Sequence, residues 1–177
     1  MPFTPFHMGP GLAIKAATGR HFSLVVFGFA QVAMDIEPLV RILRGDPILH
    51  GFTHTYLGAT LIAVAVILAG RPVCQALLDR WNAGLTSKHL APLRSPAPLS
   101  RRATATGAFI GTYSHVFLDS IMHADIQAYA PFSTAKNMLG LVSIEALHLF
   151  CVIAGAAGVM VLLGLFLWRR FASGSDS

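Results

Sequence analysis

Residues 146–168 read ALHLFCVIAGAAGVMVLLGLFLW and contain no Asp, Glu, Lys or Arg. Residues 51–70, GFTHTYLGATLIAVAVILAG, form a second stretch without these charged residues. A membrane-spanning helix needs about 20 predominantly apolar residues, so each stretch predicts one span. The two stretches together indicate an integral membrane protein.

The composition of the whole chain agrees with this class. Of its 177 residues, 54% are hydrophobic and 12% are charged, whereas a soluble domain usually carries about 25% charged residues. This balance excludes a disordered chain, a coiled coil and an ordinary soluble enzyme. The formal net charge of +5 is not organised into a basic stripe with interleaved aromatics, so we expect no nucleic-acid partner and assign the excess to cytoplasmic loops.

Two shorter stretches without charged residues, 21–34 and 103–118, predict the remaining membrane helices. The second reaches spanning length if its helix continues to His123. The first is too short alone, so we expect it to pair with residues 5–18 in a helical hairpin that turns at Gly19-Arg20. Residues 5–18 would rise only about 21 Å at 1.5 Å per residue, so part of the hairpin need not cross the bilayer.

Basic residues set the expected orientation. Residues 71–102 contain six Lys or Arg side chains against a single Asp, and Arg169-Arg170 follow the last apolar stretch. By the positive-inside rule both regions face the cytoplasm. We therefore expect a cytoplasmic C-terminus, with His50 and Lys136 near the external face.

The expected architecture is all-α, an integral membrane bundle of about four to five membrane helices plus a cytoplasmic amphipathic helix. We expect one membrane domain at 1–170 and a flexible tail at 171–177. Within the domain lie the hairpin 5–34, the span 51–70, the cytoplasmic linker 71–102 with its surface helix at 72–83, and the spans 103–123 and 146–168.

Ten ionisable side chains fall near the outer ends of these membrane segments. Such groups are costly at membrane depth and usually face a protein interior or a wet cavity, so their common placement predicts one shared site. They are His7, Asp35, Glu37, His50, His54, His115, Asp119, His123, Glu145 and His148.

The spacing within the third span refines this hypothesis. His115, Asp119 and His123 follow one another at intervals of four, so on a helix they share one face. His50 and His54 repeat this spacing at the start of span 51–70. Imidazoles and carboxylates are the ligand set of catalytic zinc and of mixed di-metal sites, which activate a water for attack.

The carboxylates Asp35 and Glu37 have a different spacing. They are two residues apart, which does not place them on one helix face. We therefore expect both on an irregular segment just before Pro38, where an extended backbone lets them converge.

Simpler readings stay open for individual members of the set. His148 can be a hydrogen-bonded packing residue, and His115 with Asp119 can form a simple hydrogen bond within a helix. Glu145 can be a residue of a helix N-terminus, favoured by the helix dipole. Asp125, outside the set, is expected to cap a loop or a helix.

Several short motifs carry a resemblance to a known family. They are PFTPFH (2–7), MDIEP (34–38), LHGFTHTYLGA (49–59), SHVFLDSIMH (114–123) and PFS (131–133). In this order they resemble the YdjM-type membrane-bound metal-dependent hydrolases of the bacterial inner membrane. The resemblance implies a multi-helix membrane protein with a metal site. It would place ligands or catalytic groups at His7, Asp35, His50, His54, His115 and Asp119, with Glu37 as a candidate.

The chain departs from the family pattern in two places. Where the family often has Pro-Asp-x-Asp, this chain has Met34-Asp35-Ile36-Glu37, which keeps both carboxylates but lengthens one side chain. The basic residue after the first His of the family's His-Arg-Gly-x-x-His element is absent, because Gly51 follows His50 directly. This absence changes the charge available for recognising a substrate.

Our first hypothesis is a metal-dependent hydrolase that opens to the periplasmic side. A metal-activated water would attack an ester or phosphoester of a small or lipid-like substrate, with Glu37 or Asp35 as the catalytic base. Membrane lipid is the other expected partner. One or two divalent ions, with zinc expected, would be held by His7, Asp35, His50, His54, His115 and Asp119, with His123, Glu145 and His148 behind them.

The alternative is a non-enzymatic membrane protein. The same residues would then hold a structural metal, or form a buried polar His/Asp network that joins the helices. A structural site is closed by protein ligands, whereas a catalytic site keeps one position open. Coordination number therefore separates the two hypotheses.

Overall fold

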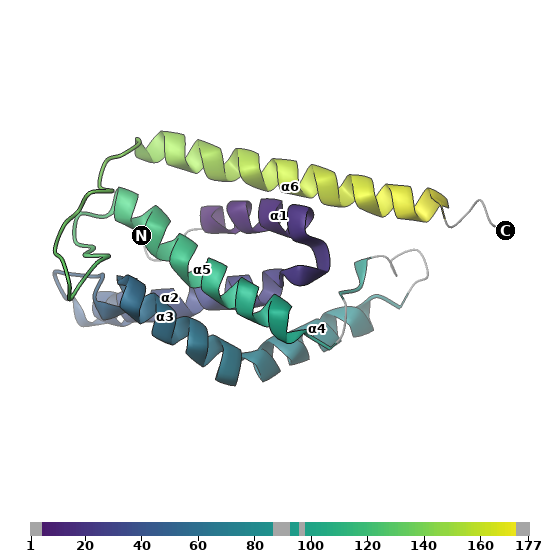
Figure 1. Ribbon diagram of the computed structural model, residues 1–177, viewed down its shortest axis with the longest axis horizontal. Coiled ribbons are helices and arrows are strands. Elements are labelled where there is room, and N and C mark those ends of the chain that lie inside the picture. The colour runs from purple at the N-terminus through teal and green to yellow at the C-terminus, as the bar shows by residue number, and fades with distance from the viewer. Residues whose placement is uncertain (1–4, 87–92, 96–97, 173–177) are drawn as a thin grey trace.

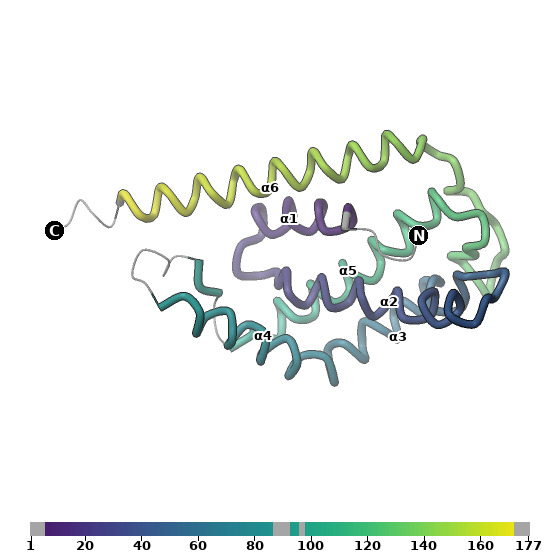
Figure 2. Tube along the Cα trace, turned by 180° about the vertical axis from the view of Figure 1, so that it is seen from behind, coloured from purple at the N-terminus to yellow at the C-terminus, as the bar shows by residue number. Residues whose placement is uncertain are grey.

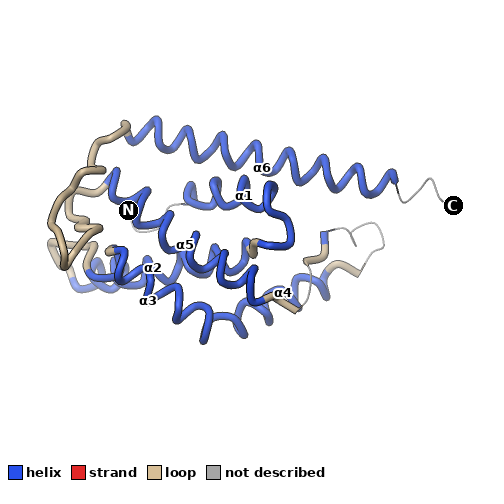
Figure 3. The backbone as a smooth tube through the Cα atoms, in the orientation of Figure 1, coloured by secondary structure: helices blue, strands red, loops and turns tan. Residues whose placement is uncertain are grey.

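The computed structural model describes residues 5–86, 93–95 and 98–172, and within these ranges its regular structure is entirely helical (Figures 1 and 3). The long helices are α1 (Met8–Thr18), α2 (Leu24–Arg44), α3 (Tyr56–Ala65), α4 (Arg71–Gly84), α5 (Arg101–Met122) and α6 (Ile144–Ala172). The short ones are η1 (Pro5–His7), η2 (Gly19–His21), η3 (Phe52–His54) and the π-helical η4 (Val66–Gly70).

The chain reverses direction between α1 and α2, at the turn that the sequence places at Gly19-Arg20. Gly19 adopts a positive φ of 55°, a conformation that glycine tolerates and other residues avoid. The ammonium of Lys15 donates to the carbonyls of Gly19 and Phe22 at 2.8 and 2.9 Å. Ser23 then caps α2, because its Oγ accepts the backbone N–H of Val26.

The expected irregular segment before Pro38 does not form, and that prediction is wrong. Helix α2 continues through Asp35, Glu37 and Pro38 to Arg44. Proline has no N–H, so the carbonyl of Met34 loses its usual helical donor. The hydroxyl oxygen of Thr53 lies 3.4 Å from Met34 O, although its one proton goes to the closer Glu37 Oε2 at 2.6 Å.

Helix α5 packs against α2 and α3, whereas α6 packs mainly against α1 (Figures 1 and 2). Glycines bring the backbones close at both contacts. A Cβ on Gly107 would lie 2.7 Å from the carbonyl oxygen of Ser23, and a Cβ on Gly158 would lie 2.5 Å from the carbonyl carbon of Leu12. Small residues at helix contacts are typical of membrane bundles, where close van der Waals packing drives helix association.

Two helical runs among the described residues are long and apolar enough to cross a membrane, Tyr56–Gly84 and Ile144–Phe171. The expectation of four to five membrane helices is therefore supported only for these two. Helix α2 is long enough but contains four charged residues, and α5 is long enough but is less apolar because it contains several Thr, Ser and Gly residues. Helix α1 has only 11 residues.

Helix α6 carries many exposed apolar side chains, and α4 continues the helical run that begins with α3. Helix α6 exposes large apolar side chains such as Leu149, Ile153 and Met160, a surface suited to lipid rather than water. Helix α4 covers the residues expected to form a surface helix, and η4 joins it to α3 without a break. Of the tail expected at 171–177, the first two residues belong to α6 and the rest lie outside the described residues.

The close approach of α1 and α6 makes Gly158 sensitive to substitution. We expect Gly158→Leu to lower the free energy of unfolding by about 1–3 kcal/mol, because the added side chain must displace the backbone of α1. Thermal unfolding of the detergent-purified protein measures this change. Gly164→Leu on the same helix is the matched control, since no atom lies within 4 Å of a Cβ there. Equal effects of the two substitutions would contradict the packing described.

Candidate metal centre

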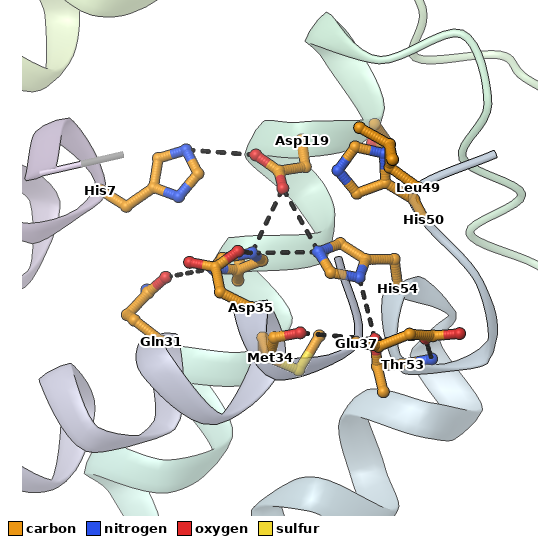
Figure 4. A network of polar contacts seen from close by, with 12 residues as sticks. His7, Gln31, Met34, Asp35, Glu37, Leu49, His50, Thr53, His54 and Asp119 are labelled. Carbon is orange, nitrogen blue, oxygen red and sulfur yellow. Dashed lines mark hydrogen bonds and ion pairs between the residues drawn. The ribbon is translucent and has the colours of Figure 1, made fainter. Parts of the chain in front are cut away.

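Four side chains from three elements converge in the interior of the bundle (Figure 4). Asp35 comes from α2, His54 from η3, and His115 and Asp119 from α5. Each offers one ligand atom, and these atoms all lie within 4.8 Å of one another. Asp35 is 9% exposed, and the other three are 3% exposed or less. We call this group the central cluster.

Local structure explains why these side chains meet. His115 and Asp119 are four residues apart on α5, so they share a face. A Cβ on Gly111 would lie 2.9 Å from the Cβ of Ala30, so the glycine lets α2 approach that face. His54 ends the single turn η3, and Thr55 immediately caps α3 by accepting the N–H of Gly58.

Electron-rich atoms face one another at short range within the cluster. The Nε2 atom of His115 lies 3.3 Å from Asp35 Oδ1 and 3.2 Å from Asp119 Oδ2. The same atom lies 3.2 Å from Nε2 of His54, which is itself 3.5 Å from Asp119 Oδ2. The protonation of the two imidazoles therefore decides whether these contacts attract or repel.

Gln31 sets the protonation of His115. Its side-chain amide donates to the carbonyl of Gly111 at 3.1 Å, which turns its Oε1 atom toward His115. That oxygen lies 2.5 Å from Nδ1 of His115 and can only accept a hydrogen bond. Nδ1 therefore carries the proton, and in the neutral ring Nε2 presents a lone pair to the cluster.

Thr53 sets the protonation of His54 in the same way. Its hydroxyl donates to Glu37 Oε2 at 2.6 Å, so its lone pairs are left to accept from Nδ1 of His54 at 3.0 Å. In the neutral ring, Nε2 of His54 also presents a lone pair inward. Two imidazole lone pairs and two carboxylates thus share one small buried volume, an arrangement that repels itself unless positive charge lies among them.

The residues present fit a divalent cation. Four buried side-chain atoms in the described part of the chain have no hydrogen-bond partner, namely Asp35 Oδ1, Asp119 Oδ1 and both ring nitrogens of His7. Buried polar atoms normally have partners, so these four indicate a ligand. Ligand atoms of a tetrahedral zinc ion lie roughly 3.4 Å apart, close to the 3.2–3.5 Å contacts in the central cluster.

His7 lies beside the central cluster rather than within it. Its Nε2 atom is 3.4 Å from Asp119 Oδ1, and its ring packs edge-on against His115, with centroids 5.1 Å apart. It is 3% exposed. The structure therefore brings together His7, Asp35, His54, His115 and Asp119, five of the ten residues expected at one site.

His50 belongs to a separate group, the loop cluster, with His123 and Asp125. The carboxylate of Asp125 accepts the backbone N–H groups of Leu49 and His50 at 3.0 and 3.1 Å, and the Nδ1–H of His50 at 2.9 Å. Partial burial acts to raise the pKa of Asp125, but the hydrogen bonds from His50 outweigh it and lower the pKa to about 2. His50 lies in an irregular segment before η3, so His50 and His54 do not form an i, i+4 pair on one helix, contrary to the sequence interpretation.

A row of imidazoles connects the two clusters. The ring centroids of His115 and His54 are 5.1 Å apart, those of His54 and His50 are 4.7 Å apart, and those of His50 and His123 are 4.5 Å apart. With His7 on the far side of His115, five rings form a continuous series of contacts. The two clusters are therefore adjacent parts of one polar region.

Besides His7, three predicted site residues lie outside both clusters. The carboxylate of Glu37 accepts hydrogen bonds from Arg41 at 2.7 and 3.0 Å and from Thr53. Glu145 is exposed at the start of α6. His148 stacks on Phe6, with ring centroids 4.5 Å apart.

The sequence interpretation missed Gln31, Thr53 and Asp125 as partners of the imidazoles. Gln31 precedes Asp35 by four residues, a signal that becomes readable once α2 is known to continue through Pro38. Thr53 directly precedes His54. Asp125 was expected to be a cap, and it does accept two backbone N–H groups, but it also binds the His50 ring.

A family model described as YdjM inner membrane protein matches residues 7–174. The chain belongs to this family. The matched region contains every residue of both clusters, and the family's description agrees with the two apolar helices in indicating a membrane location. Searches among curated proteins and among solved structures gave no significant match.

Removing a ligand of the central cluster tests the assignment. We expect His115→Ala and Asp119→Ala each to lose stoichiometric divalent metal, because each deletes an atom that faces the shared volume. Element-specific analysis of detergent-purified protein measures the content, and circular dichroism checks that the helices persist. His148→Ala is the matched control and should keep its metal, since His148 stacks on Phe6 and belongs to neither cluster. Full metal content in both cluster variants would refute the ligand set.

Proposed function

We propose that this YdjM-family protein is a membrane-bound, metal-dependent hydrolase that acts on an ester or phosphoester of a small or lipid-like substrate. The observation that carries the proposal is the pair of Nε2 atoms of His54 and His115, which face each other at 3.2 Å while both Nδ1 protons are committed elsewhere. Metal binding explains this pair together with the unpartnered oxygens of Asp35 and Asp119.

The residues of the central cluster would hold the cation. His54, His115 and Asp119 offer atoms that already lie within 3.5 Å of one another, and Asp35 adds a carboxylate from α2. A divalent cation, with zinc the first candidate, supplies Lewis acidity that lowers the pKa of water and polarises a carbonyl or phosphoryl oxygen. His7 lies where it can complete the ligand set or bind the substrate.

The two carboxylates considered as catalytic base have different surroundings. Both oxygens of Glu37 already accept hydrogen bonds from Arg41 or Thr53, so we assign Glu37 a positioning role through Thr53 and His54. Asp35 Oδ1 is buried without a hydrogen-bond partner and lies in the cluster. Asp35 is therefore the better candidate for accepting a proton from the attacking water.

The contacts of His115 also support the non-enzymatic alternative. Nε2 of His115 lies within 3.3 Å of both Asp35 and Asp119, a geometry that also suits a protonated imidazole between two carboxylates. Such a buried network would join α2 to α5 without a metal. Metal content and turnover separate this reading from the hydrolase.

Hydrolysis by the purified protein tests the proposal. We expect the metal-loaded protein to cleave at least one of three probes: p-nitrophenyl butyrate, p-nitrophenyl phosphate or a short-chain phospholipid. Chelation or Asp119→Ala should lower the rate by about 100-fold or more, because the charge that activates the water is lost. His148→Ala should keep the rate within about twofold. Stoichiometric metal without turnover of any probe would favour a structural metal.

We further propose that the C-terminus is cytoplasmic and that the metal centre opens to the periplasm. The loop 123–143 and η3 lie at one end of the bundle, and the turn between α1 and α2 lies at the other (Figures 1 and 2). Lys15, Arg20 and Arg102 line one cavity at the end with the turn. The positive-inside rule favours this end as the cytoplasmic one.

Reporter fusions test the orientation. A reporter inserted near Ser95 should read as cytoplasmic, and one inserted near Lys136 should read as external, because each position belongs to one end of the bundle. Alkaline phosphatase and green fluorescent protein fusions give opposite signals on the two sides. The reverse pattern would mean that the metal centre opens to the cytoplasm.

A further inference from the structure

A cavity of about 810 Å³ lies at the end of the bundle where α1 turns into α2, away from the loop cluster. Its walls come from the end of α1, that turn, α4, the described linker residues before α5, the start of α5 and α6. Figure 1 shows these segments at the end opposite the loop 123–143. Most of the lining is apolar and includes Leu24, Val25, Leu78, Trp81 and Leu162.

The charged residues of this lining are all basic. Lys15, Arg20 and Arg102 line the cavity, and no Asp or Glu occurs among the described lining residues. The ammonium of Lys15 donates to the backbone carbonyls of Gly19 and Phe22 rather than to a carboxylate, so its charge is not neutralised there. The cavity therefore has a positive potential that favours an anion.

The starts of two long helices add to this potential. Ser23, which caps α2, and Ser100, which caps α5, both line the cavity. The backbone N–H of Ser23 donates to the carbonyl of Ala103 at 3.3 Å, which holds the two helix starts together. Helix N-termini carry partial positive charge, so their field reinforces that of the three cations.

The apolar lining distinguishes among possible anions. A soluble phosphate would leave most of that surface without a partner, whereas a phospholipid places a phosphate against basic groups and acyl chains against apolar ones. Trp81 lines the cavity and is 55% exposed, and tryptophan is enriched where proteins meet lipid headgroups. The chain belongs to an inner membrane protein family, so phospholipid is available around it.

We propose that this cavity binds an anionic phospholipid of the surrounding bilayer, with its phosphate near Lys15, Arg20 and Arg102 and its acyl chains along the apolar lining. The proposal is independent of the hydrolase proposal, because none of these residues belongs to either cluster. The bound lipid would fill the space between the α1–α2 turn, α4 and α6.

Lipid binding by the full chain tests this proposal. Native mass spectrometry of the detergent-purified protein measures binding of dioleoyl phosphatidylglycerol and dioleoyl phosphatidylcholine. We expect the wild type to prefer the anionic lipid by roughly tenfold or more, and Arg20→Gln with Arg102→Gln to lose that preference. Arg80→Gln with Arg101→Gln is the matched control: it removes the same charge from exposed residues outside the lining and should keep the preference.

Several outcomes would overturn the proposal. One is equal binding of the two lipids by the wild type, and another is equal loss of preference in the two double variants. A third is displacement of phosphatidylglycerol by inorganic phosphate, which would indicate a site for a soluble anion. If the Arg20/Arg102 variant loses helical content, a salt titration of the wild type decides: the preference should fall as salt rises, and a preference insensitive to salt would refute it.

Discussion

The contact between Nε2 of His54 and Nε2 of His115 is the constraint on which the centre of this protein depends. The two atoms lie 3.2 Å apart, and hydrogen bonds on the far side of each ring leave a lone pair on both. Carboxylate oxygens of Asp35 and Asp119 lie within 3.5 Å of these two nitrogens. Such an arrangement in a buried site requires positive charge, from a metal ion or from a retained proton. The function of the protein depends on which of these it holds.

The rest of the fold holds this contact in place. Gly107 and Gly111 let α5 approach α2 closely, so that Gln31 and Asp35 reach the face of α5 that carries His115. Thr53 connects the carboxylate of Glu37 to the ring of His54. Helix α6 packs mainly on α1 and thereby secures the helix that begins directly after His7. The packing of the helices therefore determines the geometry of the candidate site.

The sequence was sufficient for the helical class, the family and five of the residues that converge, His7, Asp35, His54, His115 and Asp119. Four-residue spacing correctly paired His115 with Asp119, because that spacing depends only on helix geometry. The sequence did not predict the side-chain positions where the backbone departs from the expected helical pattern. Pro38 suggested a break in the helix, but α2 continues through it to Arg44. His50 and His54 have helical spacing, but an irregular backbone directs them into different clusters. Gln31 could not be assigned because its partner lies 84 residues away.

The row of imidazoles from His7 through His115, His54 and His50 to His123 has a consequence for contact with solvent. His7, His54 and His115 are almost fully buried, whereas His123 is half-buried beside the loop. The row therefore extends the polar region from the enclosed carboxylates to the surface, and its solvent-facing end is His123, next to the loop.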